Sequence, residues 1–130
     1  MLSHIYVGVG DFERAYAFYA PLLACLGLPQ KFKDGGRPWA AWMPADAPRP
    51  LFIVGKPYVG EASCGNGQMV ALQAPSRAAV DAAYAAALAH GGSSEGGPGL
   101  RPEYHAHYYG AYFRDPDGNK LCVVCHAAED

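Results

Sequence analysis

The sequence predicts an α+β fold built from two successive modules, each a strand, a helix and three further strands. Three observations predict it: a strand–helix–strand pattern opens the chain, the same order begins again halfway along, and a β-hairpin closes it. We place module 1 at residues 1–58 and module 2 at residues 65–130. A chain of 130 residues can build one sizeable core, so we expect both modules to form a single domain, 1–130.

Module 1 begins with residues 2–9, which alternate between two kinds of side chain as a half-buried strand does. Asp11 is a favourable N-cap for the helix that follows, and Gly27 is a natural terminator. Pro21 lies inside this helix and is expected to kink it or weaken its last turns, because proline lacks the backbone donor. Glycine and proline then separate three short extended runs, at residues 30–34, 39–43 and 51–54.

Module 2 repeats this order after a linker at residues 57–66. Residues 67–74 form an apolar strand, and a helix ends at Gly91 and Gly92. At an offset of 65 residues, half the chain, three kinds of position coincide: the caps Asp11 and Ser76, the tyrosines Tyr19 and Tyr84, and the glycines Gly27 and Gly92. Residues 91–107 are rich in Gly, Ser and Pro, and we expect a long loop with at most one short edge strand near its beginning.

The closing hairpin spans residues 108–126. Asp115 can accept hydrogen bonds from the amides after it, Pro116 presets the turn, and Gly118 can adopt the left-handed conformation. Because side chains alternate along a strand, one face of this hairpin is expected to line something other than the core. Alternation places Tyr108, Gly110 and Tyr112 on one face of the first strand, and in the returning strand it separates Cys122 and Val124 from Leu121 and Val123.

Composition narrows the possible partners. The net charge is −2 with no basic run, which argues against nucleic acid and against a membrane surface. No apolar stretch approaches the roughly 20 residues of a membrane span, and no signal peptide is recognisable, so we expect a cytoplasmic protein.

The four cysteines lack the spacing of a disulfide framework and are expected to be reduced. Cys122 and Cys125 form a C-x-x-C, but on a strand they point to opposite faces, which argues against a redox pair or a shared metal.

The motifs at the two ends of the chain resemble those of the vicinal oxygen chelate superfamily, the glyoxalase, bleomycin-resistance and extradiol-dioxygenase group. The motifs are His4-Ile5-Tyr6-Val7, Asp11-Phe12-Glu13-Arg14-Ala15, Phe18-Tyr19 and Phe113-Arg114-Asp115-Pro116-Asp117-Gly118-Asn119. The resemblance implies two βαβββ modules with cupped mixed sheets, and a homodimer, since small members often assemble that way. It does not fix the reaction, because this fold hosts isomerases, dioxygenases, thiol transferases and drug-binding proteins.

The resemblance also implies a divalent metal held by His, Glu or Gln from the first and last strand of each module. The matching positions are His4 and Met69 on the first strands and Cys122 on the last strand of module 2, while residues 51–54 offer no ligand. One histidine cannot hold a metal that needs oxygen or imidazole ligands, so we expect a degenerate metal site and no cofactor. A soft ion such as copper, bound by imidazole, thioether and thiolate, stays open as an alternative.

Our functional hypothesis is a glyoxalase-like protein that binds a small organic ligand in an aromatic pocket which is metal-free or only weakly metal-binding. The predicted pocket residues are His4, Tyr6, Met69, Gln73, His105, Tyr108, Tyr112, Cys122 and Val124. His105 belongs to a His-x-His motif with His107, which is able to bind metal or supply a base but is more often solvated in a loop. The alternatives are a metal-dependent lyase or dioxygenase and a drug-binding resistance protein. No catalytic residue is predicted, and whether the chain is an enzyme is left open.

Overall fold

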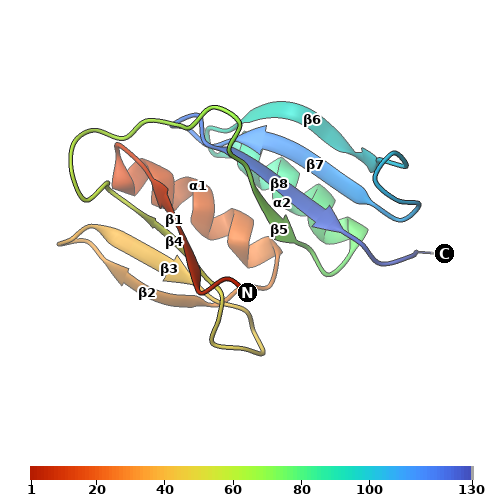
Figure 1. The fold of residues 1–130 in the computed structure, drawn as a ribbon, viewed down its shortest axis with the longest axis horizontal. Coiled ribbons are helices and arrows are strands. Elements are labelled where there is room, and N and C mark those ends of the chain that lie inside the picture. The colour runs from red at the N-terminus through yellow and green to blue at the C-terminus, as the bar shows by residue number, and fades with distance from the viewer. Residues whose placement is uncertain (130) are drawn as a thin grey trace.

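The computed structural model describes residues 1–129, which form two four-stranded sheets and two helices in a βαβββ order used twice (Figure 1). Module 1 contains β1 (His4–Gly8), α1 (Phe12–Cys25), β2 (Gln30–Asp34), β3 (Trp39–Trp42) and β4 (Leu51–Gly55). Module 2 contains β5 (Val70–Gln73), α2 (Arg77–Ala89), β6 (Ser93–Leu100), β7 (Tyr109–Arg114) and β8 (Lys120–Cys125). The strand orders are β1-β4-β3-β2 and β5-β8-β7-β6. In each sheet one edge pair is parallel, β1 with β4 in module 1 and β5 with β8 in module 2, and the other pairs are antiparallel. The predicted α+β class and the mixed sheets are therefore confirmed.

The helices begin at the predicted caps. The Asp11 carboxylate accepts a hydrogen bond from the Arg14 amide at 3.0 Å, and the Ser76 hydroxyl accepts one from the Ala79 amide at 3.1 Å. These two caps stand at equivalent positions of the two modules, as the repeat predicts. Helix α1 continues through Pro21 to Cys25, so proline does not end it there.

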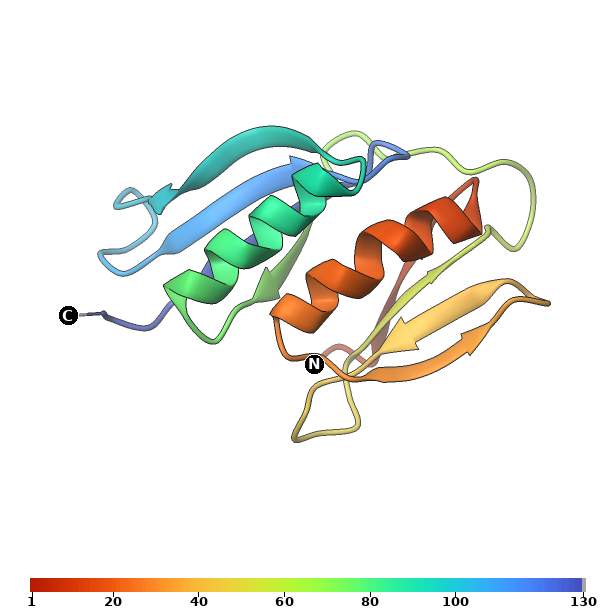
Figure 2. The ribbon, with the colours of Figure 1, turned by 180° about the vertical axis from the view of Figure 1, so that it is seen from behind.

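Helices α1 and α2 lie side by side, each against its own sheet (Figure 2). Their apolar faces share one core, in which the Phe18 ring of α1 meets the Phe113 ring of β7 edge-on at 6.2 Å. The two modules therefore depend on each other for burial of their apolar surface. No helix within residues 1–129 is both long enough and apolar enough to cross a bilayer.

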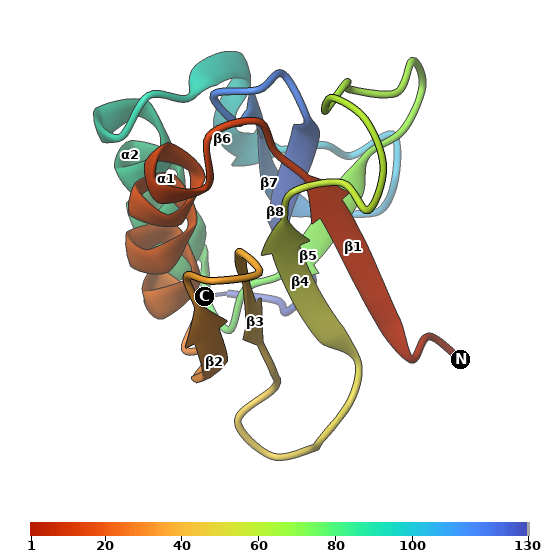
Figure 3. The same cartoon turned by 90° about the vertical axis from the view of Figure 1, so that its left-hand side faces the viewer.

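The faces of the sheets that point away from the helices are called the open faces below. Figure 3 shows both helices on the same side of the sheets. On β1, Val7 packs into the core while Tyr6 is exposed on the open face. On β3, Trp42 packs against Tyr16 of α1, whereas Trp39 lies on the open face against Phe32. The predicted alternation of side chains is thus confirmed on these strands.

Strand β6 corrects the prediction for residues 91–107. In place of a long loop with a short edge strand, Ser93–Leu100 forms an eight-residue strand paired with β7. Its register shifts between Ser94 and Gly96 and again between Gly96 and Gly99. These irregularities account for a composition rich in glycine, since bulged edge strands tolerate residues that a regular strand disfavours.

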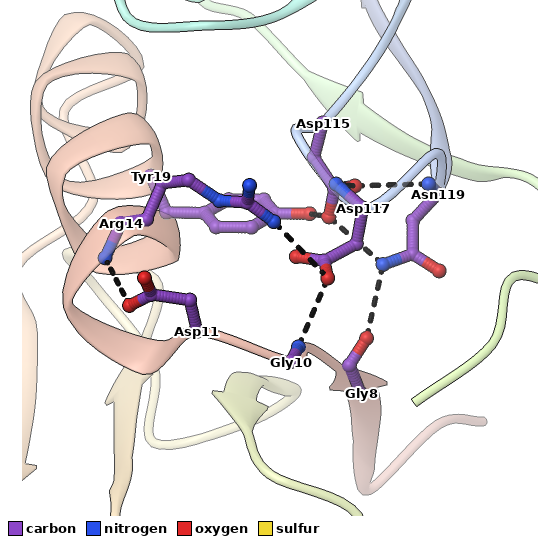
Figure 4. Close-up of polar contacts among 8 residues, drawn as sticks. All are labelled: Gly8, Gly10, Asp11, Arg14, Tyr19, Asp115, Asp117 and Asn119. Atoms are coloured by element: carbon purple, nitrogen blue, oxygen red, sulfur yellow. Dashed lines mark hydrogen bonds and ion pairs between the residues drawn. The ribbon is translucent and has the colours of Figure 1, made fainter. Parts of the chain in front are cut away.

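The predicted turn of the closing hairpin is confirmed, and it joins the modules (Figure 4). Asp115 is only 3 % exposed, and its carboxylate accepts hydrogen bonds from the Tyr19 hydroxyl at 2.6 Å and from the Asn119 side chain at 2.9 Å. It also accepts from the backbone amides of Asp117 and Asn119, both at 2.9 Å. Gly118 has φ +91°, the left-handed conformation expected of it. Because Tyr19 belongs to α1, a module 2 turn is anchored on module 1.

Candidate functional site

Tyr6 lies on the open face of β1 and lines two hollows. Its hydroxyl donates a hydrogen bond to the Lys56 carbonyl at 2.6 Å, and a methyl group at Gly55 would overlap that hydroxyl. The side chain is nevertheless 44 % exposed. Burial of the phenol raises the pKa of Tyr6, and the charge of Arg37 partly opposes this shift.

Two hollows meet at Tyr6, and together we call them the Tyr6 groove. One has a volume of about 680 Å³ and is lined by Tyr6, Arg37, Lys56 and Glu61, among others. The other measures about 690 Å³ and extends from Tyr6 to Met69 and Lys120. Such volumes fall within the range of small-molecule pockets. The groove thus brings together two predicted pocket residues, Tyr6 and Met69.

Other predicted residues lie elsewhere. His4 is exposed on β1, with its Nδ1 atom 2.9 Å from the Ser3 hydroxyl, and it lines neither part of the Tyr6 groove. Gln73 lies beside an apolar hollow of about 410 Å³ between the modules, whose lining includes Trp42 and Phe52.

Tyr108, Tyr112 and Cys122 form a hydrogen-bonded group on the open face of module 2, which we call the tyrosine–cysteine cluster. The Tyr108 hydroxyl lies 2.9 Å from the Tyr112 hydroxyl and 3.5 Å from the Cys122 sulfur. The Tyr108 ring covers Gly110, where an added Cβ would come within 2.9 Å of it. Val124 is paired with Gly110 and is also buried.

Cys122 is fully buried. Burial raises the pKa of the Cys122 thiol, although hydrogen bonds from the two tyrosines and the charges of Arg101 and Lys120 act in the opposite direction. Burial also raises the pKa values of Tyr108 and Tyr112. A neutral thiol is a poor nucleophile and a poor metal ligand, so Cys122 is suited to neither role near neutral pH.

His105 lies next to the tyrosine–cysteine cluster and contacts a residue that the sequence did not single out. Its ring stacks on His126 at 5.1 Å, with Nε2 of His105 and Nδ1 of His126 2.9 Å apart. The His107 amide donates to Nδ1 of His105 at 3.1 Å. The neutral His105 ring therefore carries its proton on Nε2 and donates it to His126. No sequence signal links these histidines, which are 21 residues apart.

The donors do not fit a hard or borderline divalent metal. Every residue of β4 is buried, and the strand offers only apolar side chains and glycine. Cys122 is a buried thiol. Among the three positions that match the family's metal ligands, His4, Met69 and Cys122, only His4 offers an imidazole. Within the described 129 residues, no three His, Cys, Asp or Glu side chains lie close enough to hold a metal ion. A carboxylate and imidazole set of the kind that such ions require is not formed by these residues.

Four basic side chains at the site were missed by the sequence reasoning: Arg37, Lys56, Arg101 and Lys120. The Arg37 guanidinium lies over the Trp39 ring at 3.6 Å. Arg101 and Lys120 lie within 5.6 and 5.9 Å of the Tyr112 ring centroid. Their positions depend on how loops and strand ends fold over the open faces, which alternation alone does not reveal.

A family model described as the glyoxalase/bleomycin resistance protein/dioxygenase superfamily matches residues 1–123. The crystal structure of a glyoxalase/bleomycin resistance protein from Albidiferax ferrireducens T118 is 35% identical, with a TM-score of 0.85, and the match covers 96% of this chain and 98% of that one. No curated protein matches the chain.

More distant structures share the fold. A glyoxalase-related enzyme from Fulvimarina pelagi is 18% identical, with a TM-score of 0.71 over 96% of this chain and 87% of that one. A family enzyme from Burkholderia phytofirmans PsJN is 14% identical, with a TM-score of 0.67 over 96% and 98% of the two chains. At such identities the similarity concerns the fold alone.

Proposed function

Because this chain belongs to the glyoxalase/bleomycin resistance protein/dioxygenase superfamily, we propose that it binds a small organic molecule in the Tyr6 groove without the help of a metal ion. The observation that carries the proposal is the groove itself, two hollows of about 680 and 690 Å³ that meet at a half-exposed tyrosine. Sites for small molecules are concave and combine apolar walls with a few polar groups that fix orientation.

The lining of the groove suits an organic ligand with an aromatic or flat apolar part. Tyr6 offers a ring whose hydroxyl is already fixed by the Lys56 carbonyl, and Met69 offers a flexible thioether that adapts to irregular shapes. Arg37 and Lys56 supply positive charge against the single carboxylate of Glu61. This balance favours a neutral or anionic ligand and disfavours a cationic drug, which was one of the alternatives.

The test uses purified protein dialysed against EDTA and a set of small aromatic probes: phenol, catechol, indole and benzamide. We expect at least one probe to show saturation transfer from the protein in NMR, and Tyr6→Ala to abolish that signal. The matched control is Leu88→Ala, since Leu88 on α2 is exposed to a similar extent, 40 % against 44 % for Tyr6. Equal loss in both variants, or no signal from any probe, would contradict the proposal.

The same preparation tests the metal-dependent lyase or dioxygenase. Under our proposal, adding Mn²⁺, Ni²⁺, Zn²⁺ or Cu²⁺ leaves probe binding unchanged, and metal analysis of protein purified without chelator finds far less than one ion per chain. Stoichiometric metal that is lost in His4→Ala would favour the metal enzyme instead.

We also propose that two copies associate through the side of the molecule that carries β1 and β5. Both are edge strands, and the exposed apolar residues beside them include Leu2, 52 % exposed, and Met69, 44 % exposed. Edge strands with exposed apolar residues favour pairing with another chain. Light scattering after size exclusion is expected to give a dimer that the double variant Leu2→Glu, Met69→Glu dissociates, whereas Leu88→Glu on the helix side leaves it intact. A monomer in the unaltered protein would refute this.

The cytoplasmic location stays a prediction from the sequence.

A further inference from the structure

The linker between the two modules, residues 57–66, forms one wall of the Tyr6 groove. Tyr58 and Glu61 line the hollow of about 680 Å³, and Ser63 lines both this hollow and the one of about 690 Å³. Figure 1 shows the linker arching from the end of β4 to the beginning of β5. A change in the path of the linker would therefore change the shape of the groove.

Few interactions hold the linker in this position. Within residues 1–129, its backbone makes no hydrogen bond with another backbone group, and Glu61 forms no salt bridge. A further hollow of about 350 Å³ lies between the linker and the residues Val9 and Gly10. Segments with few hydrogen bonds and little packing have the lowest local stability in a folded protein, so the linker is the part of the groove wall that moves most easily.

Two glycines allow the backbone of this segment to change direction. Gly60 lies inside the linker with φ +77°, and Gly67 lies just beyond its end with φ +87°. Glycine adopts positive and negative φ values about equally well, so a change between them costs little at these positions. The space around both residues is open, since an added Cβ would have no atom within 4 Å at either one.

Tyr58 is the side chain that gains most from a movement of the linker. It is 96 % exposed although it lines the same hollow as Tyr6, and the neighbouring Val59 is 79 % exposed. An aromatic ring that stays almost wholly in water lacks the favourable free energy of burying its apolar surface. A flat ligand that lies on Tyr6 would offer the Tyr58 ring a surface to cover.

We propose that the linker closes over the bound ligand and that Tyr58 becomes the second aromatic wall of the Tyr6 groove. This inference rests on the proposed function, because closure requires a ligand in that groove. Tyr58 is then a specificity-determining residue that selects ligands with a flat apolar part, since stacking on a second ring stabilises only such a shape. Closure also removes water from the groove, which strengthens the polar contacts inside it.

The first measurement is the affinity for the four probes phenol, catechol, indole and benzamide, obtained by NMR titration of the unaltered protein and its variants. Tyr58→Ala is expected to weaken by about tenfold the binding of every probe that the Tyr6 groove binds, whereas Tyr58→Phe keeps the ring and changes the affinity by less than about twofold. The matched control is Tyr104→Ala, because Tyr104 is also an exposed tyrosine, at 63 %, but lines neither hollow. Its affinities should equal those of the unaltered protein.

The second measurement separates closure of the linker from a fixed contact with Tyr58. Endoproteinase Glu-C cleaves after glutamate, and both Glu61 in the linker and Glu103 in the loop before β7 are exposed. A saturating concentration of the same probe is expected to slow cleavage after Glu61 by about fivefold or more and to leave cleavage after Glu103 unchanged. In Tyr58→Ala, at a probe concentration that saturates the variant, this protection of Glu61 should disappear.

The outcomes distinguish closure from the proposed function. Probe binding that Tyr6→Ala abolishes but Tyr58→Ala leaves unchanged would overturn closure while the proposed function stands. Weaker binding in Tyr58→Ala without protection of Glu61 in the unaltered protein would also overturn closure, because Tyr58 would then be a fixed part of the wall. Failure of all four probes to bind would overturn both.

Discussion

At the scale of single residues, the most constrained polar group is Asp115. Its carboxylate is almost completely buried, yet no cation among residues 1–129 contacts it, and four donors satisfy its oxygens instead. Hydrogen bonds from backbone amides and from a phenol stabilise an anion where water cannot reach it. The motif that contains Asp115 was recognisable in the sequence as a turn. Its second role, joining the turn to Tyr19 of the other module, was not, because the two residues are 96 positions apart.

Replacing Asp115 by asparagine tests this role. The amide nitrogen would face donors and leave at least one buried hydrogen-bonding group without a partner, so we expect a loss of about 2–4 kcal/mol in the free energy of unfolding. Urea denaturation followed by circular dichroism measures it. Asp81→Asn is the control, since Asp81 also accepts from a tyrosine hydroxyl but at an exposed position, where the expected loss is below about 1 kcal/mol. Equal losses of stability in the two variants would show that burial does not increase the contribution of Asp115 to the free energy of unfolding.

Cysteine reactivity is a second residue-scale prediction. Cys64 is exposed, while Cys122 is fully buried and burial raises the pKa of its thiol. Iodoacetamide at pH 7.5 is therefore expected to modify Cys64 at least ~100-fold faster than Cys122, which reacts only when the structure opens. Mass spectrometry of peptides after timed quenching gives both rates, and 6 M guanidinium should abolish the difference. Comparable rates in the native protein would mean that the tyrosine–cysteine cluster is open.

At the scale of elements, local signals in the sequence predicted most of the structure and failed at one strand. The caps of α1 and α2 and the alternation in β1, β7 and β8 were predicted because each depends on neighbouring residues. The length of strand β6 was underestimated because its glycines and proline carry no apolar alternation, and its conformation comes from pairing with β7. The basic groups around the candidate site were missed for a similar reason, since tertiary folding brings them together.

Gly92, just before β6, shows why glycine is needed there. An added Cβ would come within 2.7 Å of the Ala87 carbonyl oxygen and of the Phe18 ring, and within 2.9 Å of the Arg114 carbonyl oxygen. Gly92→Ala is therefore expected to lower the free energy of unfolding by about 1–3 kcal/mol. Urea denaturation is the measurement, and Gly97→Ala within β6 is the control, because the nearest atom there, the Tyr84 hydroxyl oxygen, is 3.9 Å away. If both variants lose the same stability, the cost belongs to glycine replacement in general and not to this close contact.

At the scale of the whole molecule, two repeats have become one unit with unlike open faces. Both helices and the helix-facing sides of both sheets contribute to one core, so neither module is expected to fold alone. The open face of module 1 is filled by an apolar cluster around Ile53, whereas module 2 carries hydroxyls, a thiol and basic groups. The repeat was readable from the sequence. The difference between the two open faces could not be read from the sequence, because it depends on which side chains pack over each sheet in the folded protein.

The protonation of this molecule predicts how its stability varies with pH. Burial raises the pKa values of Cys122, Tyr19, Tyr108 and Tyr112, so each group holds its proton more tightly in the folded than in the unfolded state. The stabilisation is fully present below the unfolded values, about 8.5 for cysteine and about 10 for tyrosine, and is lost as pH rises above them. We therefore expect the free energy of unfolding to fall between pH 8.5 and pH 10, with Cys122 among the contributing groups.

Urea denaturation at pH 7, 8.5 and 10 measures this dependence below the ordinary pKa of lysine, about 10.4, so that the four lysines contribute little. Cys122→Ser removes the thiol, so its stability should fall less over the same interval, whereas Cys64→Ser should behave as the unaltered protein does because Cys64 is exposed. A constant free energy of unfolding up to pH 10 would mean that Cys122 ionises as easily in the folded as in the unfolded chain. The burial of the tyrosine–cysteine cluster would then not stabilise the protonated thiol of Cys122.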